Sequence, residues 1–72
     1  MSVEMKQVSS SNIFAVGYDA DNQIVHVQFL QGTEYIYKGV PPHEFEGLLY
    51  APSVGSYLNR NFKNIYPYER VS

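Results

Sequence analysis

The double proline at residues 41–42 divides the chain into two parts with different hydrophobic periods. Before it, apolar and polar side chains alternate, most regularly over residues 24–29, as they do in a half-buried strand. After it, apolar residues recur three and four positions apart at Phe45, Leu48 and Leu49. Proline lacks the N–H that a central strand must donate, but it suits the first turn of a helix. The sequence therefore predicts strands first and helices second.

The part before the prolines predicts three β-strands, over residues 13–18, 24–29 and 34–38. The cluster Asp-Ala-Asp-Asn separates the first two strands, and such side chains favour turns because they bond their own backbone. Alternation in the second strand puts Val25 and Val27 on one face and polar side chains on the other. This pattern indicates a sheet with one buried face.

Two helices are predicted after the strands. The first begins at the prolines, and its early glutamates lie near the positive end of the helix dipole. The second lies within residues 53–66, where Ser53 or Ser56 can cap its start and Pro67 ends it. Its apolar face is predicted to hold Leu58, Phe62 and Ile65.

This order of elements gives an α+β fold: a three-stranded antiparallel meander followed by two helices packed on one face (βββαα). Residues 68–72 follow as an extended tail or a short C-terminal edge strand. Residues 1–8 are polar with scattered apolar residues, and we expect them to be loosely ordered. Residues 9–72 are expected to form a single domain, since 72 residues suffice for one small core.

Tyr35 and Tyr37 point to the same side of their strand, and the turn before them decides which side. A two-residue turn would expose both rings as a platform for stacking bases, but it strains the residue before Gly32. A three-residue loop with Gly32 in the left-handed region strains nothing and places the tyrosines opposite Val25 and Val27. We therefore predict that the tyrosines complete the apolar face, with Gly32 as a structural residue.

Composition and charge exclude several classes of protein. The net charge of −2 argues against a strongly basic nucleic-acid binder, although residues 50–72 carry three cations against one glutamate. The chain has no cysteine, so it has neither a disulfide framework nor a thiolate zinc site. It has no secretory signal and no run of roughly 20 apolar residues that could span a membrane. We expect a cytoplasmic protein that does not contact membranes.

Catalytic and metal-binding patterns are absent from the sequence. His26 and His43 are the only histidines, and nothing near them supplies the three or four ligands of a typical metal site. No serine lies close in sequence to a histidine that could activate it. We therefore expect no metal, no cofactor and no enzymatic activity.

The most suggestive local chemistry is the stretch Ser-Val-Gly-Ser-Tyr-Leu-Asn-Arg, at the start of the second predicted helix. Free backbone N–H groups and hydroxyls at a helix start can bind an anion, and glycine lets a phosphate approach closely. A plain helix cap with a packing glycine is the alternative. The candidate anion or nucleic-acid site consists of Ser53, Gly55, Ser56, Asn59, Arg60 and Lys63.

The motifs in their order resemble the KTSC domain, a short module named for the C-terminus of some lysyl-tRNA synthetases and also found alone in small bacterial proteins. The resemblance runs from about Ser9 to Tyr66 and includes Val-His-Val-Gln-Phe, Tyr-Ile-Tyr and Gly-Val-Pro. It ends in an Ala-x-Ser-x-Gly-x-Tyr-x-Asn pattern. The family has no established activity, and its link to a synthetase only suggests RNA binding. The residues carried over as pattern matches are Tyr35, Tyr37, Ser53, Gly55 and Asn59.

Two functions follow as hypotheses. The first is a non-enzymatic module that binds nucleic acid, RNA in particular, through the mildly basic second helix. The alternative is a protein-interaction accessory, such as a small phage or stress-associated protein, and the acidic net charge favours it. This alternative uses the polar sheet face that carries His26, Gln28, Ile36 and Lys38.

Overall fold

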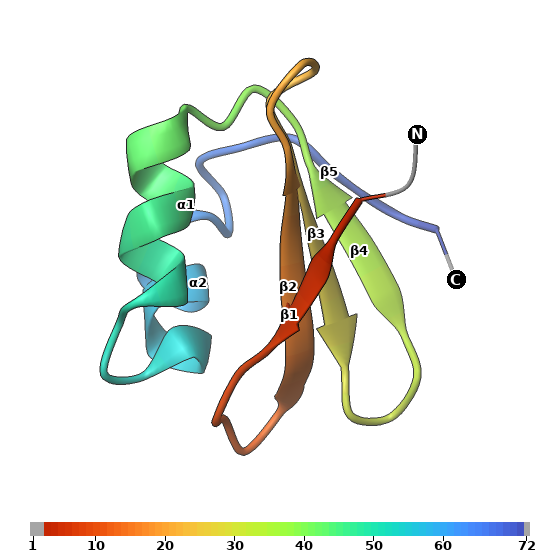
Figure 1. Ribbon diagram of the computed structural model, residues 1–72, viewed down its shortest axis with the longest axis vertical. Coiled ribbons are helices and arrows are strands. Elements are labelled where there is room, and N and C mark those ends of the chain that lie inside the picture. Colours follow the sequence, from red (N-terminus) through yellow and green to blue (C-terminus); the bar gives the residue numbers. More distant parts are fainter. Residues whose placement is uncertain (1–2, 72) are drawn as a thin grey trace.

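A computed structural model describes residues 3–71 and shows an α+β fold with one five-stranded antiparallel sheet. The strands lie in the order of the sequence, and both helices cover the same face of the sheet (Figure 1). The predicted meander and the two helices after it are confirmed. The elements are β1 (Met5–Gln7), β2 (Ile13–Asp19), β3 (Ile24–Phe29), β4 (Glu34–Tyr37), α1 (Pro42–Leu49), α2 (Val54–Asn61) and β5 (Tyr68–Arg70).

Two short strands extend the meander at its edges. β5 pairs with β4, which confirms the C-terminal edge strand. β1 corrects the expectation of a loosely ordered segment over residues 1–8, of which residues 1–2 lie outside the described part. Met5 pairs with Gly17, where an added Cβ would lie 2.6 Å from the Met5 sulfur. β1 is held by backbone pairing with β2, and the glycine allows Met5 to approach closely.

The hairpin between β3 and β4 has the predicted register. Gly32 has a φ of 101°, and its N–H donates to the carbonyl of Phe29 at 3.0 Å. The three-residue loop then places Tyr35 opposite Val27, and the next pair toward the end of β4 is Tyr37 with Val25. Residues that pair directly across two strands share a face, so both tyrosines lie on the helix-covered face with Val25 and Val27. A loop one residue shorter would have turned them outward.

The helices match the prediction except at the end of α2. Ser53 caps α2, its hydroxyl accepting a hydrogen bond from the Ser56 N–H at 3.3 Å. Ile65 was predicted on the buried face, but it is 60% exposed. The helix ends at Asn61, and Asn64 then takes a φ of 69°, a left-handed conformation that asparagine tolerates. Both helices have eight residues, and no helix within residues 3–71 is long and apolar enough to cross a membrane.

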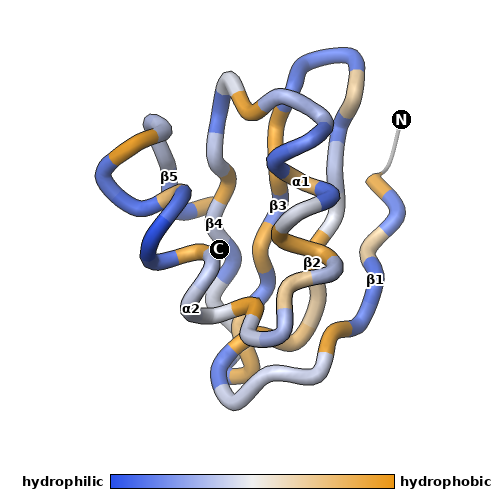
Figure 2. Tube along the Cα trace, turned by 90° about the vertical axis from the view of Figure 1, so that its left-hand side faces the viewer, coloured by the Kyte–Doolittle hydropathy of each residue, from blue (hydrophilic) through white to orange (hydrophobic). Residues whose placement is uncertain are grey.

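The core between the sheet and the helices has two parts. Viewed from the helix side in Figure 2, α1 lies over β2 and β3, and α2 lies toward β4. In the α1 half, the rings of Tyr18 and Phe45 stack with centroids 5.1 Å apart. In the α2 half, Tyr37 meets Phe62 edge to face at 5.6 Å. The buried core consists of Ile13, Val16, Val25, Val27, Tyr37, Val40, Leu48, Val54, Leu58 and Phe62.

Candidate functional site

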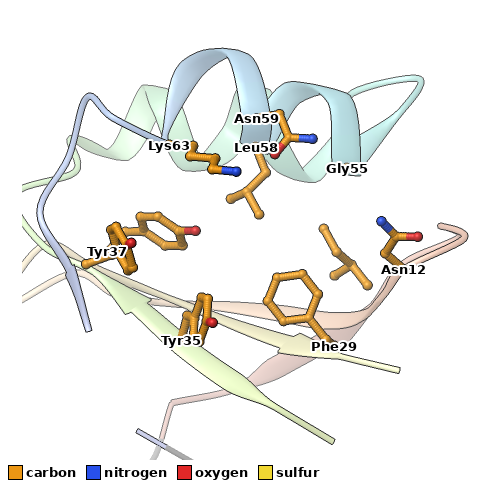
Figure 3. Close-up of a pocket in the computed structure, with 10 residues that line it drawn as sticks. Asn12, Phe29, Tyr35, Tyr37, Gly55, Leu58, Asn59 and Lys63 are labelled. Carbon is orange, nitrogen blue, oxygen red and sulfur yellow. The ribbon is translucent and has the colours of Figure 1, made fainter. Parts of the chain in front are cut away.

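A pocket of about 310 Å³ opens between the sheet and α2, on the helix-covered face of β3, β4 and β5 (Figure 3). Its sheet side is aromatic, and its helix side is small and polar around one leucine. We call it the α2 pocket. Its lining residues are Asn12, Ile13, Phe29, Tyr35, Tyr37, Gly55, Leu58, Asn59, Lys63 and Tyr68.

The aromatic rings of the α2 pocket hold one another in place. Tyr35 meets Phe29 edge to face at 5.6 Å, and Tyr68 lies 5.8 Å from both Tyr35 and Tyr37. The register explains this cluster, because Tyr68 pairs with Tyr37 across β4 and β5. Tyr68 is 56% exposed, so its ring forms the outer part of the cluster. Such fixed rings can stack on a planar ligand without first losing conformational freedom.

Tyr37 contributes a phenol hydroxyl to the α2 pocket. The residue is only 4% exposed, and burial raises the pKa of its phenol, with a smaller contribution from the phenols of Tyr35 and Tyr68. Within residues 3–71 the hydroxyl makes no hydrogen bond, and it is open to the pocket, because no buried side-chain oxygen or nitrogen there lacks a partner. Figure 3 shows Tyr37 on the sheet side of the pocket, below Lys63. At neutral pH the phenol is protonated and is available as a donor.

Charge around the α2 pocket is positive. Lys63 lines it, and none of its ten lining residues is acidic. The register pairs Arg70 with Tyr35, so Arg70 lies on the same face of the sheet beside the pocket. Carboxylates instead lie elsewhere: Glu44 accepts from Tyr57 on the helices at 3.4 Å, and Glu69 pairs with Lys38 at 3.2 Å. An anionic group would therefore meet cations at the pocket and no carboxylate among its lining residues.

The six residues predicted as one site border two separate surfaces. Gly55, Asn59 and Lys63 line the α2 pocket, Lys63 from the turn that follows the helix. The other three border a shallow surface next to Tyr57. The two serine hydroxyls already form a hydrogen bond, which the Ser53 hydroxyl donates to the Ser56 hydroxyl at 3.1 Å. These three residues are Ser53, Ser56 and Arg60.

Sequence reasoning did not assign Asn12, Phe29 and Tyr68 to a site. Of these three, only Phe29 could have been predicted from the sequence, because the register that turns Tyr35 inward also places Phe29 beside it. Tyr35 and Tyr37 were interpreted as structural. The structure gives Tyr37 a place both in the core and in the pocket lining.

The opposite face of the sheet holds the residues of the alternative hypothesis. His26 pairs with Ile36 across β3 and β4, and its Nδ1 lies 3.4 Å from Glu34 Oε2. Lys38 forms an ion pair with Glu69. Within residues 3–71 no group of three or more potential ligands could hold a metal ion. We call this surface the outer sheet face.

Comparison with known proteins identifies the family. The model of the KTSC domain matches residues 9–66. The chain belongs to the KTSC domain family. It is also 41% identical over 70 residues to an uncharacterized protein of Stutzerimonas stutzeri (strain A1501), covering 93% of this chain and 99% of that one. A protein of Tsukamurella paurometabola is 46% identical over 55 residues, covering 76% of this chain and 82% of that one.

A solved structure shows the same fold. The crystal structure of a KTSC domain protein from Yersinia pestis superimposes with a TM-score of 0.91 at 32% sequence identity. The match covers 99% of this chain and 100% of that one. Tyr68 lies outside residues 9–66 that match the KTSC model, although it lines the α2 pocket. One wall of the pocket thus comes from β5, which follows the matched segment.

Proposed function

We propose that this KTSC protein is a non-enzymatic module that binds single-stranded nucleic acid, with RNA the favoured form, through the α2 pocket and the surface around it. The supporting observation is the lining of the pocket, which combines four aromatic rings with Lys63 and contains no carboxylate. Proteins that bind single strands use the same combination, with bases stacking on rings and cations following the backbone. The proposal includes a cytoplasmic location, where RNA is available.

The same lining favours binding over catalysis. The α2 pocket contains no histidine and no carboxylate, the groups that most often transfer protons at neutral pH. Its ionisable phenol at Tyr37 has a raised pKa because of burial, so it stays protonated and cannot serve as a base near pH 7. Amides, rings and an amine can recognise a ligand, and the proposal needs nothing more.

The charge of the protein sets the expected strength of binding. Lys63 and Arg70 lie at or beside the α2 pocket, while the whole chain carries a net charge of −2. Each phosphate contact to a single strand contributes a slope of about −0.7 to log K against log salt. One contact, through Lys63 in the pocket lining, predicts a slope of that size. Binding should therefore be weak and clearly salt-sensitive.

A charge-reversal pair on α2 tests the proposal. Arg60→Glu with Lys63→Glu should leave the fold intact and abolish binding to short single-stranded RNA. The structure sharpens this test, because Lys63 lines the α2 pocket, whereas Arg60 borders a separate shallow surface. Lys63→Glu alone should carry most of the loss, with Arg60→Glu as a control of equal charge change. NMR titration at low salt is the measurement, and unshifted amides from Ser53 to Lys63 in the wild type would contradict the proposal.

Protein interaction through the outer sheet face is the second candidate. Its support is that the charged groups there already pair with each other, as Lys38 does with Glu69 at 3.2 Å, around the half-buried Ile36. Such a surface offers little to a polyanion. A partner bound there should respond weakly to salt, and Ile36→Asp should release it while leaving RNA titrations unchanged.

A further inference from the structure

We infer that the α2 pocket is a site for one nucleotide, whose base enters between the sheet and α2 while its phosphate stays at the rim. This inference rests on the proposed function and makes it more specific. The volume of about 310 Å³ is at the lower end of the roughly 300–1,000 Å³ of small-molecule pockets. There is room for one planar heterocycle with its sugar, and a second base must remain outside.

The hydroxyl of Tyr37 is a donor that a ligand in the pocket can use. The two tyrosines on the inner face of the sheet differ in this respect, because the Tyr18 hydroxyl donates to the Val40 carbonyl at 2.6 Å. The ring of Tyr37 is fixed by packing, since the residue is 4% exposed. Its hydroxyl makes no hydrogen bond within residues 3–71 and is open to the pocket, because no buried side-chain oxygen or nitrogen there lacks a partner. A ring nitrogen or carbonyl on the edge of a base would accept from it.

Two amides border the α2 pocket on different sides. Asn59 reaches it from α2, and Asn12 closes the end near Phe29 (Figure 3). The Ser11 hydroxyl donates to Asn12 Oδ1 at 3.1 Å, which leaves the amide nitrogen of Asn12 as a donor. The pocket thus offers ring faces for stacking and donors for the edge of the ring. This is the chemistry that recognises an unpaired nucleobase.

Cationic side chains lie at the rim of the α2 pocket, where the phosphate of the same nucleotide would be placed. Lys63 extends over the pocket in Figure 3, and Arg70 lies beside Tyr35 on the same face of the sheet. A free nucleotide and a nucleotide within a strand present the same base and phosphate. Both can enter the α2 pocket, and they are distinguished by experiment.

Removing the bases from the ligand separates this inference from the proposed function. NMR titrations would compare a short oligouridylate, an abasic oligonucleotide of equal length and charge, and free uridine monophosphate. Loss of one stacked base should weaken binding of the abasic strand by about ten- to a hundredfold. Equal binding of the two strands overturns the one-base pocket but leaves the proposed function standing. Binding of the mononucleotide without either strand supports the pocket and overturns the polymer ligand, and no shift with any of the three overturns both.

Filling the pocket tests the inference on the protein side. Gly55 lines the pocket, and a Cβ added there would meet only Ser10 Oγ, at 3.8 Å, an ordinary contact distance. The backbone therefore accepts a side chain at this position, and we expect a leucine to occupy part of the pocket. Gly55→Leu also raises helix propensity, so the variant should fold. We expect it to bind oligouridylate at least tenfold more weakly, while the matched Gly55→Ala keeps most of the affinity. A folded Gly55→Leu that binds like the wild type overturns the inference.

Removing a single oxygen from the pocket completes the test. Tyr37→Phe keeps the ring and its packing but deletes the donor that the base is expected to use. We expect binding of oligouridylate to weaken by about three- to tenfold, the effect of one hydrogen bond. The abasic strand serves as the matched ligand and should bind the variant and the wild type equally. An unchanged affinity for oligouridylate would contradict the inferred hydrogen bond between Tyr37 and the base.

Discussion

The α1 half and the α2 half of the core both carry a tyrosine on the inner face of the sheet, but the hydroxyls of the two tyrosines have different surroundings. In the α1 half, Tyr18 stacks on Phe45 at an interplanar angle of 12° and its hydroxyl bonds the Val40 carbonyl. In the α2 half, Tyr37 packs against Phe62 while its hydroxyl borders an open pocket. One phenol is used within the protein, and the other keeps its donor free for something outside it.

The difference follows from where the helices lie. Tyr57 of α2 closes the contact between the helices, because its phenol lies against Gly47 and donates to Glu44 at 3.4 Å. α2 ends at Asn61, and the chain then turns away toward β5. The helix is therefore too short to cover the aromatic cluster of β4 and β5. The α1 half is closed by packing, and the α2 half retains the pocket in which we propose that a ligand binds.

The largest expected effect comes from removing the ring that both roles share. Tyr37→Ala deletes a side chain that is 4% exposed and in contact with Phe62, so it should lower the free energy of unfolding by about 3 kcal/mol. Tyr35→Ala is the matched variant and should cost less, because Tyr35 is only half-buried. Urea denaturation measures both. Equal losses would mean that the α2 half is not packed more tightly around Tyr37 than around Tyr35.

The next effect concerns the loop that turns both tyrosines inward. Gly32→Val puts a β-branched residue at a φ of 101° and should cost about 1–3 kcal/mol through backbone strain. An added Cβ there meets nothing within 4 Å, so strain and not a clash is the cause. Thermal unfolding compares this variant with Thr33→Val in the same loop. A Gly32→Val protein as stable as the wild type would refute the loop conformation.

How much of the fold could be predicted depends on whether its cause is local. The register of β3 and β4 follows from Gly32, because the left-handed conformation of that one residue fixes the loop length. β1 was missed because Met5–Gln7 has no strand pattern and forms by pairing with β2, where Met5 contacts Gly17, twelve residues away along the chain. Ile65 was misplaced because the helical spacing continues past Asn61, although the backbone does not.

The lining of the α2 pocket could be predicted only in part, for a related reason. Gly55, Asn59 and Lys63, which line it, were grouped because they follow each other closely in the sequence. They were grouped with Arg60 and the capping serines, which border a separate shallow surface. Tyr68 could not be found, because its place beside Tyr37 depends on pairing between strands separated by both helices. Pockets built by distant pairing leave no local pattern.

The third prediction compares the two phenols directly. Tyr18→Phe loses a hydrogen bond of 2.6 Å and leaves the Val40 carbonyl without that donor, so it should destabilise the fold by about 1 kcal/mol. Tyr37→Phe should change stability by about 0.3 kcal/mol or less, since its hydroxyl bonds no other residue within 3–71. Urea unfolding of both variants under one buffer condition gives the difference. A Tyr37→Phe variant as unstable as Tyr18→Phe would mean that the free donor of the α2 half is already used.

The smallest effect is a dependence of stability on alkaline pH. Burial raises the pKa of Tyr37 above the ordinary value of about 10, while the same phenol in the unfolded chain ionises near that value. Above pH 10 the unfolded state therefore binds fewer protons than the folded state, so the free energy of unfolding falls as pH rises. Below pH 10 both states are protonated, and this phenol causes no change. Tyr37→Phe should make the alkaline decline shallower in urea unfolding at pH 9 and above. An unchanged decline would mean that the phenol of Tyr37 is as well solvated in the folded protein as in the unfolded chain. Water would then reach the Tyr37 phenol through the α2 pocket.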